Sequence, residues 1–246
     1  MSDKAIKNIQ TKFKKALTNY KLIENNDHIL IGLSGGKDSL ALVQLLGERM
    51  KIFVPRFKVT AAHITVENIA YQSDLDYLKE HCNQFGVNFI HKVTSFDMDK
   101  EPDKSKCFLC SWHRRKALFE LAKEIGCNKI ALGHHLDDIV ETTLLNMIYQ
   151  GAIASMPPIL KMEKFDMTII RPLCLISESE MKEMEQLFGY KKQIKNCPYE
   201  KESSRKDAKD LIRELEKWNP EVRQSIWASM HNIKTEYLPK KSDFRD

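Results

Sequence analysis

Three short stretches of the sequence hold residues that could do chemistry. Residues 33–39 read LSGGKDS and join two glycines to hydroxyl, ammonium and carboxylate groups. Residues 107–115 read CFLCSWHRR, with two cysteines three positions apart and two adjacent arginines. Residues 133–138 read GHHLDD and bring two histidines together with two aspartates. Glycines with hydroxyl and ammonium donors favour a bound anion, whereas cysteine, histidine and aspartate are metal ligands.

The glycine loop at residues 33–39 is predicted to hold phosphate. Its spacing fits neither the G-x-x-x-x-G-K-[ST] loop nor the G-x-G-x-x-G dinucleotide fingerprint, which disfavours a simple P-loop kinase or a dehydrogenase. Gly35 and Gly36 let backbone N–H groups approach an anion, and the helix expected after them points its N-terminus at the same place. A turn that is merely capped by Ser34 or Asp38 is the disfavoured alternative. Further donors and a Mg²⁺ ligand are available from Ser34, Ser39, Lys37 and Asp38.

Residues 132–142, which read LGHHLDDIVET, are predicted to form a second wall of the same site. In a doubly wound sheet the ligand lies beyond the carboxyl ends of the strands. His134 and Asp138 are four positions apart and can share one helix face. Capping of the next helix by Asp137 or Asp138 is compatible with nucleotide contact, and a transition-metal site is the less favoured alternative.

The cysteine pair Cys107 and Cys110 leaves several kinds of site open. A CxxC pair can bind zinc, act as a redox couple, hold an iron–sulfur cluster or simply pack in a helix. Zinc favours a second close pair, and the sequence shows none. Cys197 lies far downstream, in KNCPYE. Three thiolates would leave one corner of a [4Fe–4S] cluster for an exogenous ligand. The remaining cysteines lie in apolar stretches and are expected to be core thiols: Cys82, Cys127 and Cys174.

Alternating strand and helix patterns position these stretches. Apolar runs predict strands near 28–34, 57–66, 87–94, 129–134 and 168–172, with helices near 38–50, 73–85, 108–125 and 137–150. The fold class is therefore α/β, with a doubly wound, mostly parallel five-stranded sheet. Exposed loops are expected at 95–106 and 151–167.

The chain is expected to have three parts. Residues 1–24 form an amphipathic helix, residues 25–175 form the nucleotide-binding domain, and residues 176–246 form a helical extension. In that extension, Ser177 to Glu180 has the capping-box spacing, and Asn219-Pro220 supplies an N-cap with proline at the first helical position. Gly86 and Gly126 stand where helices end.

Composition narrows the class of protein. The chain has 246 residues, 42% of them hydrophobic and 30% charged, with a formal charge of +5. No apolar signal-peptide core and no run of about 18 apolar residues is present, so a cytoplasmic protein with reduced thiols is expected. Positive charge is concentrated in residues 1–23, with six lysines against Asp3, and in residues 191–213, with eight Lys or Arg against four acids.

The loops at 33–39 and 132–142 together resemble those of the PP-loop superfamily, whose adenine nucleotide alpha-hydrolase-like fold is therefore expected. The resemblance implies that S-G-G-x-D-S holds the pyrophosphate of ATP while AMP passes to a carbonyl-type oxygen, which becomes a good leaving group. It implies that Lys37 and Asp38 are catalytic and that Asp38 binds Mg²⁺. The implied ATP-binding residues are Leu33, Ser34, Gly35, Gly36, Lys37, Asp38, Ser39, His63, Gly133, His134, Asp138 and Arg171.

Within that superfamily the chain resembles the tRNA 2-thiocytidine synthetase family. The motifs that carry the resemblance are LSGGKDSLAL, CFLCSWHRR, KIALGHHLDD, GAIASMPP, IIRPL and IWASMHNI, from the N-terminal helix to about Leu238. The resemblance implies adenylation of the C2 oxygen of cytidine 32 in tRNA and its replacement by sulfur. It assigns a [4Fe–4S] cluster to the catalytic cysteines Cys107, Cys110 and Cys197. Ile194 stands where many family members have another cysteine.

The resemblance also implies partners. Arg114 and Arg115 are expected to bind tRNA phosphates, which gives affinity without sequence information. The target base would be splayed out of its loop. The other partners are ATP and a sulfur donor, expected to be a cysteine desulfurase, and the resemblance admits a homodimer.

Three rival functions carry different signatures. A 2-thiouridine-forming thiolase usually has additional zinc-binding CxxC pairs near its ends, and residues 1–30 and 200–246 contain no cysteine. A lysidine synthetase-like ligase shares the nucleotide loop but does not need Cys107 and Cys110. A non-catalytic iron–sulfur or RNA-binding module would not need an intact Lys37-Asp38-Ser39.

Overall fold

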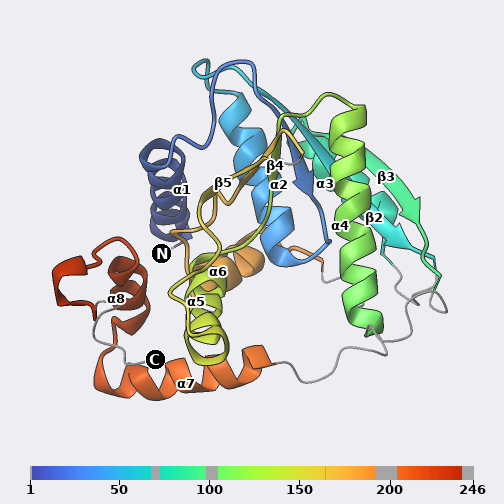
Figure 1. Ribbon diagram of the computed structural model, residues 1–246. Helices are drawn as coiled ribbons and strands as arrows, with labels where there is room; N and C mark the ends of the chain where they lie inside the picture. Colours follow the sequence, from blue (N-terminus) through green and yellow to red (C-terminus); the bar gives the residue numbers. More distant parts are fainter. Residues whose placement is uncertain (1, 68–72, 98–104, 164, 192–203, 240–246) are drawn as a thin grey trace. The chain divides into compact units, whose positions relative to one another are not determined.

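The computed structural model describes residues 2–67, 73–97, 105–163, 165–191 and 204–239 (Figure 1). Its contacts define two compact units. The first comprises residues 1–136 and 157–202, and the second comprises residues 137–156 and 203–246. No helix in these described ranges is long and apolar enough to cross a membrane.

The first unit is built around a six-stranded sheet with the order β3-β2-β1-β4-β6-β5. Neighbouring strands from β3 to β6 are all parallel, whereas β5 is antiparallel to β6. The strands are β1 (His28–Gly32), β2 (Lys58–Val66), β3 (Asn88–Thr94), β4 (Lys129–Ala131), β5 (Ile159–Met162) and β6 (Met167–Ile170). The α/β fold class and the mostly parallel sheet are thus confirmed, with one more strand than the sequence predicts.

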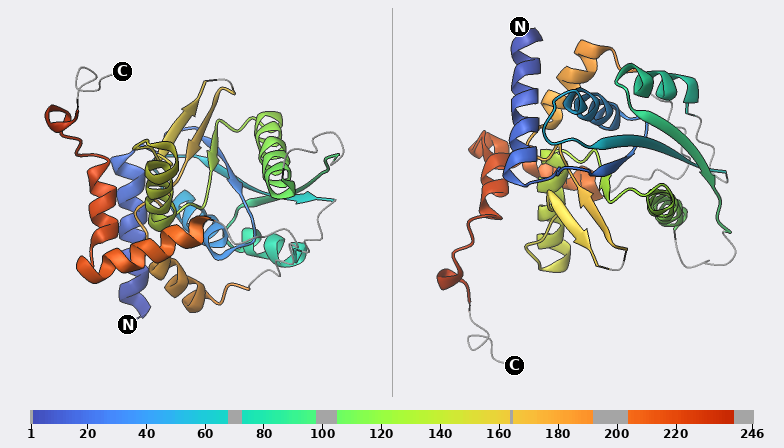
Figure 2. Two further views of the ribbon diagram at one scale, coloured as in Figure 1. Left: turned by 60° about the horizontal axis from the view of Figure 1, so that its bottom comes forward. Right: turned by 90° about the horizontal axis from the view of Figure 1, so that it is seen from above.

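Helices cover both faces of this sheet (Figure 2). Ile29 and Ile31 point into the core on one face, and Leu30 between them points into the core on the other, as the period of two in a strand requires. The first face is covered by α1 (Ser2–Asn19), α2 (Lys37–Met50), α3 (Leu75–Gln84) and α6 (Glu178–Phe188). The second is covered by α4 (Lys106–Glu124).

The second unit is helical. It contains α5 (Leu136–Gln150) from its second residue onward, α7 (Ser204–Trp218), α8 (Val222–Ser229) and the short 3₁₀ helix η1 (Thr235–Tyr237). Charged side chains of α7 and α8 pair with acids of α5: Lys209 lies 3.8 Å from Glu141, and Arg223 lies 2.6 Å from Asp137. These pairs link segments that are far apart in the sequence.

The residues predicted to begin and end helices are confirmed in part. The capping box is confirmed, because the Ser177 hydroxyl accepts from Glu180 N while the Glu180 carboxylate accepts from Ser177 N. Gly86 and Gly126 adopt the expected left-handed backbone, with φ of 69° and 71°. The predicted cap at Asn219 is wrong, because α8 begins at Val222 and Glu221 is its N-cap. The Asn219 side chain instead accepts a hydrogen bond from Glu221 N, which forms a turn before the helix.

The predicted loop over residues 151–167 is also wrong in part, because it contains β5. This strand runs along the edge of the sheet, and Ile159 and Leu160 are exposed. It is antiparallel and short, so it lacks the buried apolar run by which the parallel strands are recognised. The loop predicted over 95–106 ends at Ser105, which caps α4, and residues 98–104 lie outside the described part.

Candidate nucleotide and cluster site

The glycine loop follows β1 and leads directly into α2, as predicted. Gly35 has a φ of 79°, a left-handed conformation that favours glycine. Gly36 is the N-cap of α2, and it has no side chain to cap the first N–H groups of the helix. Those N–H groups, together with the positive end of the helix dipole, form the kind of site that binds phosphate.

Hydroxyl groups hold the glycine loop in shape. Ser39 Oγ donates to the carbonyl oxygen of Gly36 at 2.9 Å and lies 3.2 Å from Ser34 Oγ. Ser34 Oγ also accepts a bond from Gly36 N at 3.3 Å. Leu33 is buried, and its N–H donates to Ala62 in the neighbouring strand β2. The loop is therefore anchored at both ends.

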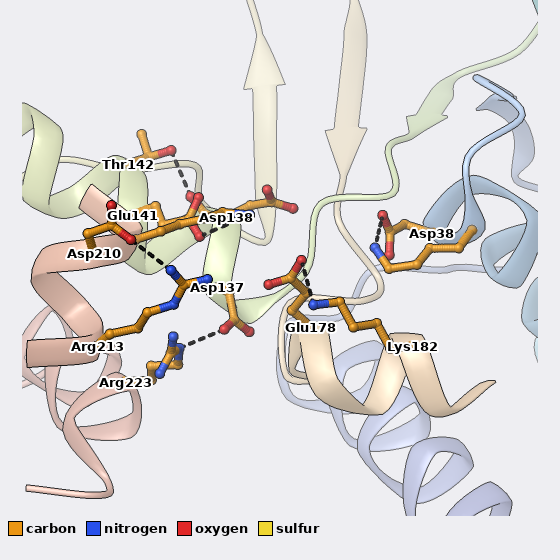
Figure 3. A network of polar contacts seen from close by, with 12 residues as sticks. Asp38, Asp137, Asp138, Glu141, Thr142, Glu178, Lys182, Asp210, Arg213 and Arg223 are labelled. Carbon is orange, nitrogen blue, oxygen red and sulfur yellow. Dashed lines mark hydrogen bonds and ion pairs between the residues drawn. The ribbon is translucent and has the colours of Figure 1, made fainter. Parts of the chain in front are cut away.

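Asp38 has the chemistry of a Mg²⁺ ligand. Its Oδ2 accepts a bond from Lys37 Nζ at 3.0 Å (Figure 3). Its Oδ1 is buried and has no hydrogen-bond partner among the described residues. A buried carboxylate oxygen without a donor is costly unless a cation or water satisfies it. Oxygen from one or two carboxylates together with substrate phosphates is the usual Mg²⁺ environment, so these residues fit the ion.

The loop at residues 132–135 packs against the start of α2, which brings two of the predicted motifs together. A Cβ atom placed on Gly133 would lie 3.2 Å from the carbonyl carbon of Asp38 and 3.2 Å from the backbone nitrogen of Ser39. A side chain at position 133 would therefore require the backbone of the phosphate loop to shift by a few tenths of an ångström. The glycine of GHHLDD is therefore needed by its contact with the phosphate loop.

Replacing Gly133 by alanine should weaken ATP binding. The new methyl group would push on backbone atoms that cannot rotate away, and overpacking of this kind costs about 1–3 kcal/mol. We expect a reduced affinity for ATP and a lower unfolding temperature, measured by titration and by thermal unfolding. Gly36→Ala is the comparison, because its Cβ would meet no atom closer than 3.5 Å. Equal ATP affinity for wild type and Gly133→Ala would contradict the close contact.

His63 lies beneath the glycine loop as part of β2. It is buried, and its Nδ1 donates to the carbonyl oxygen of Leu33 at 2.7 Å. Burial lowers the pKa of His63, the bond to Leu33 partly opposes this, and the charges of Arg114 and His91 lower the pKa further. His63 is thus a neutral ring that supports the loop from behind. Its predicted contact with ATP stays a prediction.

Arg171 and His134 form a pair that sequence reasoning did not anticipate. Arg171 Nε donates to His134 Nδ1 at 3.2 Å, and Arg171 Nη1 donates to the carbonyl oxygen of Pro157 at 2.6 Å. Because a guanidinium can only donate, Nδ1 of His134 must be the acceptor and the neutral ring carries its proton on Nε2. Burial, with a smaller contribution from Arg115, lowers the pKa of Arg171 to about 10. Arg171 stays charged at neutral pH and can orient His134.

The two described cysteines of the predicted cluster stand within the first five residues of α4. Cys107 is exposed and Cys110 is half-buried, and their spacing of three places them on one side of the helix. Cys197 lies outside the described residues. By contrast, burial raises the pKa of Cys82, Cys127 and Cys174 to about 12, which makes these thiols poor ligands. The thiols of Cys107 and Cys110 are thus the accessible ones among the described cysteines, their part in a cluster stays a prediction, and the predicted core thiols lie in the core.

The topology brings α4 and the glycine loop to the same edge of the sheet. In a parallel sheet every helix that follows a strand begins at the carboxyl edge, as α2 does after β1 and α4 does after β3. One strand, β2, separates β1 from β3, so the two strands lie about 10 Å apart across the sheet, and β3 runs from the level of Gly32, at Ile90, on to Thr94. Arg114 acts electrostatically on His63, and Arg115 acts on Arg171. Both arginines therefore add positive charge near this edge.

The acidic residues of α5 include Glu141, which the sequence analysis did not single out. Asp137 pairs with Arg223, and Glu141 Oε2 is buried with no hydrogen-bond partner in the described ranges (Figure 3). Burial raises the pKa of Glu141 to about 7, which nearby Lys209 partly opposes. Asp138 is half-buried, and its predicted contact with ATP stays a prediction. No group of three or more His, Cys, Asp or Glu side chains suited to a metal ion occurs among the described residues.

Comparison with known proteins agrees with this geometry. A family model described as "PP-loop domain" matches residues 5–209. A tRNA-cytidine(32) 2-sulfurtransferase of Geotalea uraniireducens is 32% identical over 97% of this chain and 96% of its own length. The enzyme of the same name from Bdellovibrio bacteriovorus is 36% identical over 94% and 90% of the two chains.

A solved structure also resembles the protein closely. The U34-tRNA thiolase NcsA from Methanococcus maripaludis, solved with its [4Fe-4S] cluster, superposes with a TM-score of 0.76 and 28% identity. The match covers 97% of this chain and 81% of that one. The glycine loop, the sheet order and these matches lead to one conclusion. The chain belongs to the PP-loop family and, within it, to the tRNA-cytidine(32) 2-sulfurtransferases.

Proposed function

We propose that the protein replaces the C2 oxygen of cytidine 32 in tRNA by sulfur, in a reaction that converts ATP to AMP and pyrophosphate. The observation that carries the proposal is that the phosphate loop and the cysteine pair share one edge of one sheet. Adenylation and sulfur transfer to a single base need both groups beside it. The named activity of the relatives supports the same reaction.

The chain's own residues supply binding and charge. N–H groups at the start of α2 hold the pyrophosphate, with Lys37 balancing its charge and Asp38 holding Mg²⁺. His134, held by Arg171, offers its Nε2 proton at this edge as a hydrogen-bond donor. Arg114 and Arg115 bind tRNA phosphate. These groups favour the charge that develops when AMP is transferred to the base.

The balance of the reaction needs no oxidant. The C2 oxygen attacks the α-phosphorus of ATP and pyrophosphate leaves. Sulfide then forms the C–S bond as the C–O bond breaks, and the oxygen departs with AMP. A [4Fe–4S] cluster held by Cys107, Cys110 and Cys197 would present that sulfur at its open corner. We propose a cysteine desulfurase as the sulfur donor, with a thiol reductant that releases the sulfur of its persulfide as sulfide, and a cytoplasmic location, where tRNA and ATP are both present.

The test is direct analysis of the product. Protein purified without oxygen is assayed for iron and sulfide, then incubated with sulfide, ATP, Mg²⁺ and an unmodified tRNA transcript that carries cytidine 32. Mass spectrometry of the nucleosides should show 2-thiocytidine, and a transcript with uridine 32 should give none. Formation of 2-thiouridine at position 34 instead would assign the activity named for NcsA. No thiolated nucleoside from iron-loaded protein would refute the proposal.

A further inference from the structure

We infer that the outward face of α1 binds the phosphate backbone of the tRNA substrate, away from the reacting base. The face, called here the lysine face, consists of Lys4, Lys7, Thr11, Lys14, Lys15 and Thr18, all of which are exposed. The inference rests on the proposed function, because it names a surface for the same substrate.

The helical period separates this face from the core. Ile9, Phe13 and Leu17 are buried and recur at spacings of four, so they fix the inward side of α1. At 100° per residue, all six members of the lysine face fall on the opposite side of the helix. The helix spans 18 residues, or about 27 Å, so the face is long enough to follow several phosphates.

The lysine face has no acidic partners in the part of the chain that the structure describes. Among the residues described by the structure, no carboxylate forms an ion pair with Lys4, Lys7, Lys14 or Lys15. The lysine of α1 that does have a partner is Lys12, at 2.6 Å from Glu180 on the flank that meets α6. The positive charge of the lysine face is therefore available to an external anion.

Two cations in the second half of α7 show the opposite arrangement. Arg213 pairs with Asp210 and Lys217 pairs with Glu214, both at 2.7 Å. Such pairs neutralise the charge of an exposed helix and support it locally. An exposed, charged helix of this protein can thus supply acidic partners for its own cations. The structure describes no such partners for the lysine face of α1.

The charges of the first lysines of this face do not favour the helix. Lys4 and Lys7 lie near the N-terminus, where the helix dipole disfavours positive charge, and Asp3 is the acid of the first turn. Lys4 and Lys7 are three positions apart, where like charges repel one another. An arrangement that the isolated helix disfavours is explained if a polyanion covers it.

The start of α1 lies at the sheet edge that holds the active site. The chain leaves α1 at Asn19 and enters β1 at the amino edge, so α1 is antiparallel to β1 and its first residues lie toward the carboxyl edge (Figure 1). Asn8 Nδ2 donates to Glu180 at the start of α6 at 2.7 Å. The residue before that helix's cap, Ile176, accepts a bond from Leu136 N just after the loop at 132–135. An RNA bound at that edge can therefore extend along α1.

The chemistry of the face favours duplex backbone over other anions. Its members are lysine and threonine, with no exposed aromatic ring that could stack on unpaired bases. It also lacks the apolar side chains by which a helix enters a lipid surface. Flexible ammonium groups and hydroxyls are the donors that contact phosphates without reading sequence.

The test compares two triple variants with equal loss of charge. The first is Lys7→Gln, Lys14→Gln and Lys15→Gln. The second is Lys92→Gln, Lys182→Gln and Lys217→Gln, which removes lysines that each pair with an acid. Affinity for an unmodified tRNA transcript is measured from 50 to 300 mM salt, beside thermal unfolding and ATP binding.

If the inference holds, the first variant binds tRNA on the order of 100-fold more weakly at 0.1 M salt, and its log–log salt slope falls by about 2–3, since each lost phosphate contact removes about 0.7–0.9. The second variant should match wild type, and both should bind ATP normally. Unchanged affinity and slope in the first variant would overturn the inference and assign the face to another partner, such as an acidic protein. Wild-type protein without affinity for tRNA would instead overturn the proposed function.

Discussion

Replacing Asp38 by alanine should abolish ATP-dependent thiolation while leaving the fold intact. One oxygen of this carboxylate is bonded to Lys37, and the other is buried without a partner in the described residues, where Mg²⁺ fits. Loss of a metal ligand removes several kcal/mol of stabilisation of the developing charge, so a fall of about 10³-fold or more in rate is expected. Pyrophosphate release and nucleoside analysis measure it.

The stability of the Asp38→Ala variant separates this role from a structural one. The pair with Lys37 is partly exposed, so its loss should change the free energy of unfolding by no more than about 0.5 kcal/mol. Asp76→Ala is the matched control, because Asp76 is also an acid in the first turn of a helix. Normal pyrophosphate release by Asp38→Ala, or its loss in Asp76→Ala, would refute the assignment.

The second large effect concerns the cysteines. Cys107→Ala, Cys110→Ala and Cys197→Ala should each lose the cluster and stop thiolation, because a [4Fe–4S] centre with three thiolates has none to spare. Iron and sulfide counts on protein purified without oxygen measure the first effect, and nucleoside mass spectrometry measures the second. ATP binding should survive in all three, because the glycine loop is built by other residues.

The buried cysteines are the controls for that series. Cys82→Ala, Cys127→Ala and Cys174→Ala should keep iron and activity and lose only a few kcal/mol of stability at most, through the small cavities that they leave. Loss of iron in Cys174→Ala with full iron in Cys197→Ala would move the third ligand to Cys174. Zinc in purified protein with activity in every variant would exclude sulfur transfer through a cluster.

Much of the sheet could be predicted because its strands are buried on both faces. The apolar runs around Ile29 and Val59 have few alternatives to a parallel strand, and the glycine loop between a strand and a helix is unmistakable. The strand β5 was missed because it is an edge strand with one partner, where exposed residues and the neighbouring prolines indicate a loop.

The contacts inside the site could be predicted less well than its members. The motifs place His134 and Arg171 near the carboxyl edge, but nothing in their spacing of 37 positions shows that one donates to the other. The sequence likewise does not show why position 133 is a glycine. The reason is its close approach to the backbone atoms of Asp38. Side-chain partners across the sheet depend on packing, which sequence periodicity does not encode.

The second unit is discontinuous along the chain, and this sets an order for its assembly during synthesis. Residues 137–156 leave the ribosome well before residues 203–246, with which they form one unit. Until then the ion pairs of Asp137 with Arg223 and of Glu141 with Lys209 cannot form. Such long sequence separation slows folding and leaves unpartnered surface exposed to chaperones. The nascent chain can therefore complete its phosphate loop while the helical unit is still only half made.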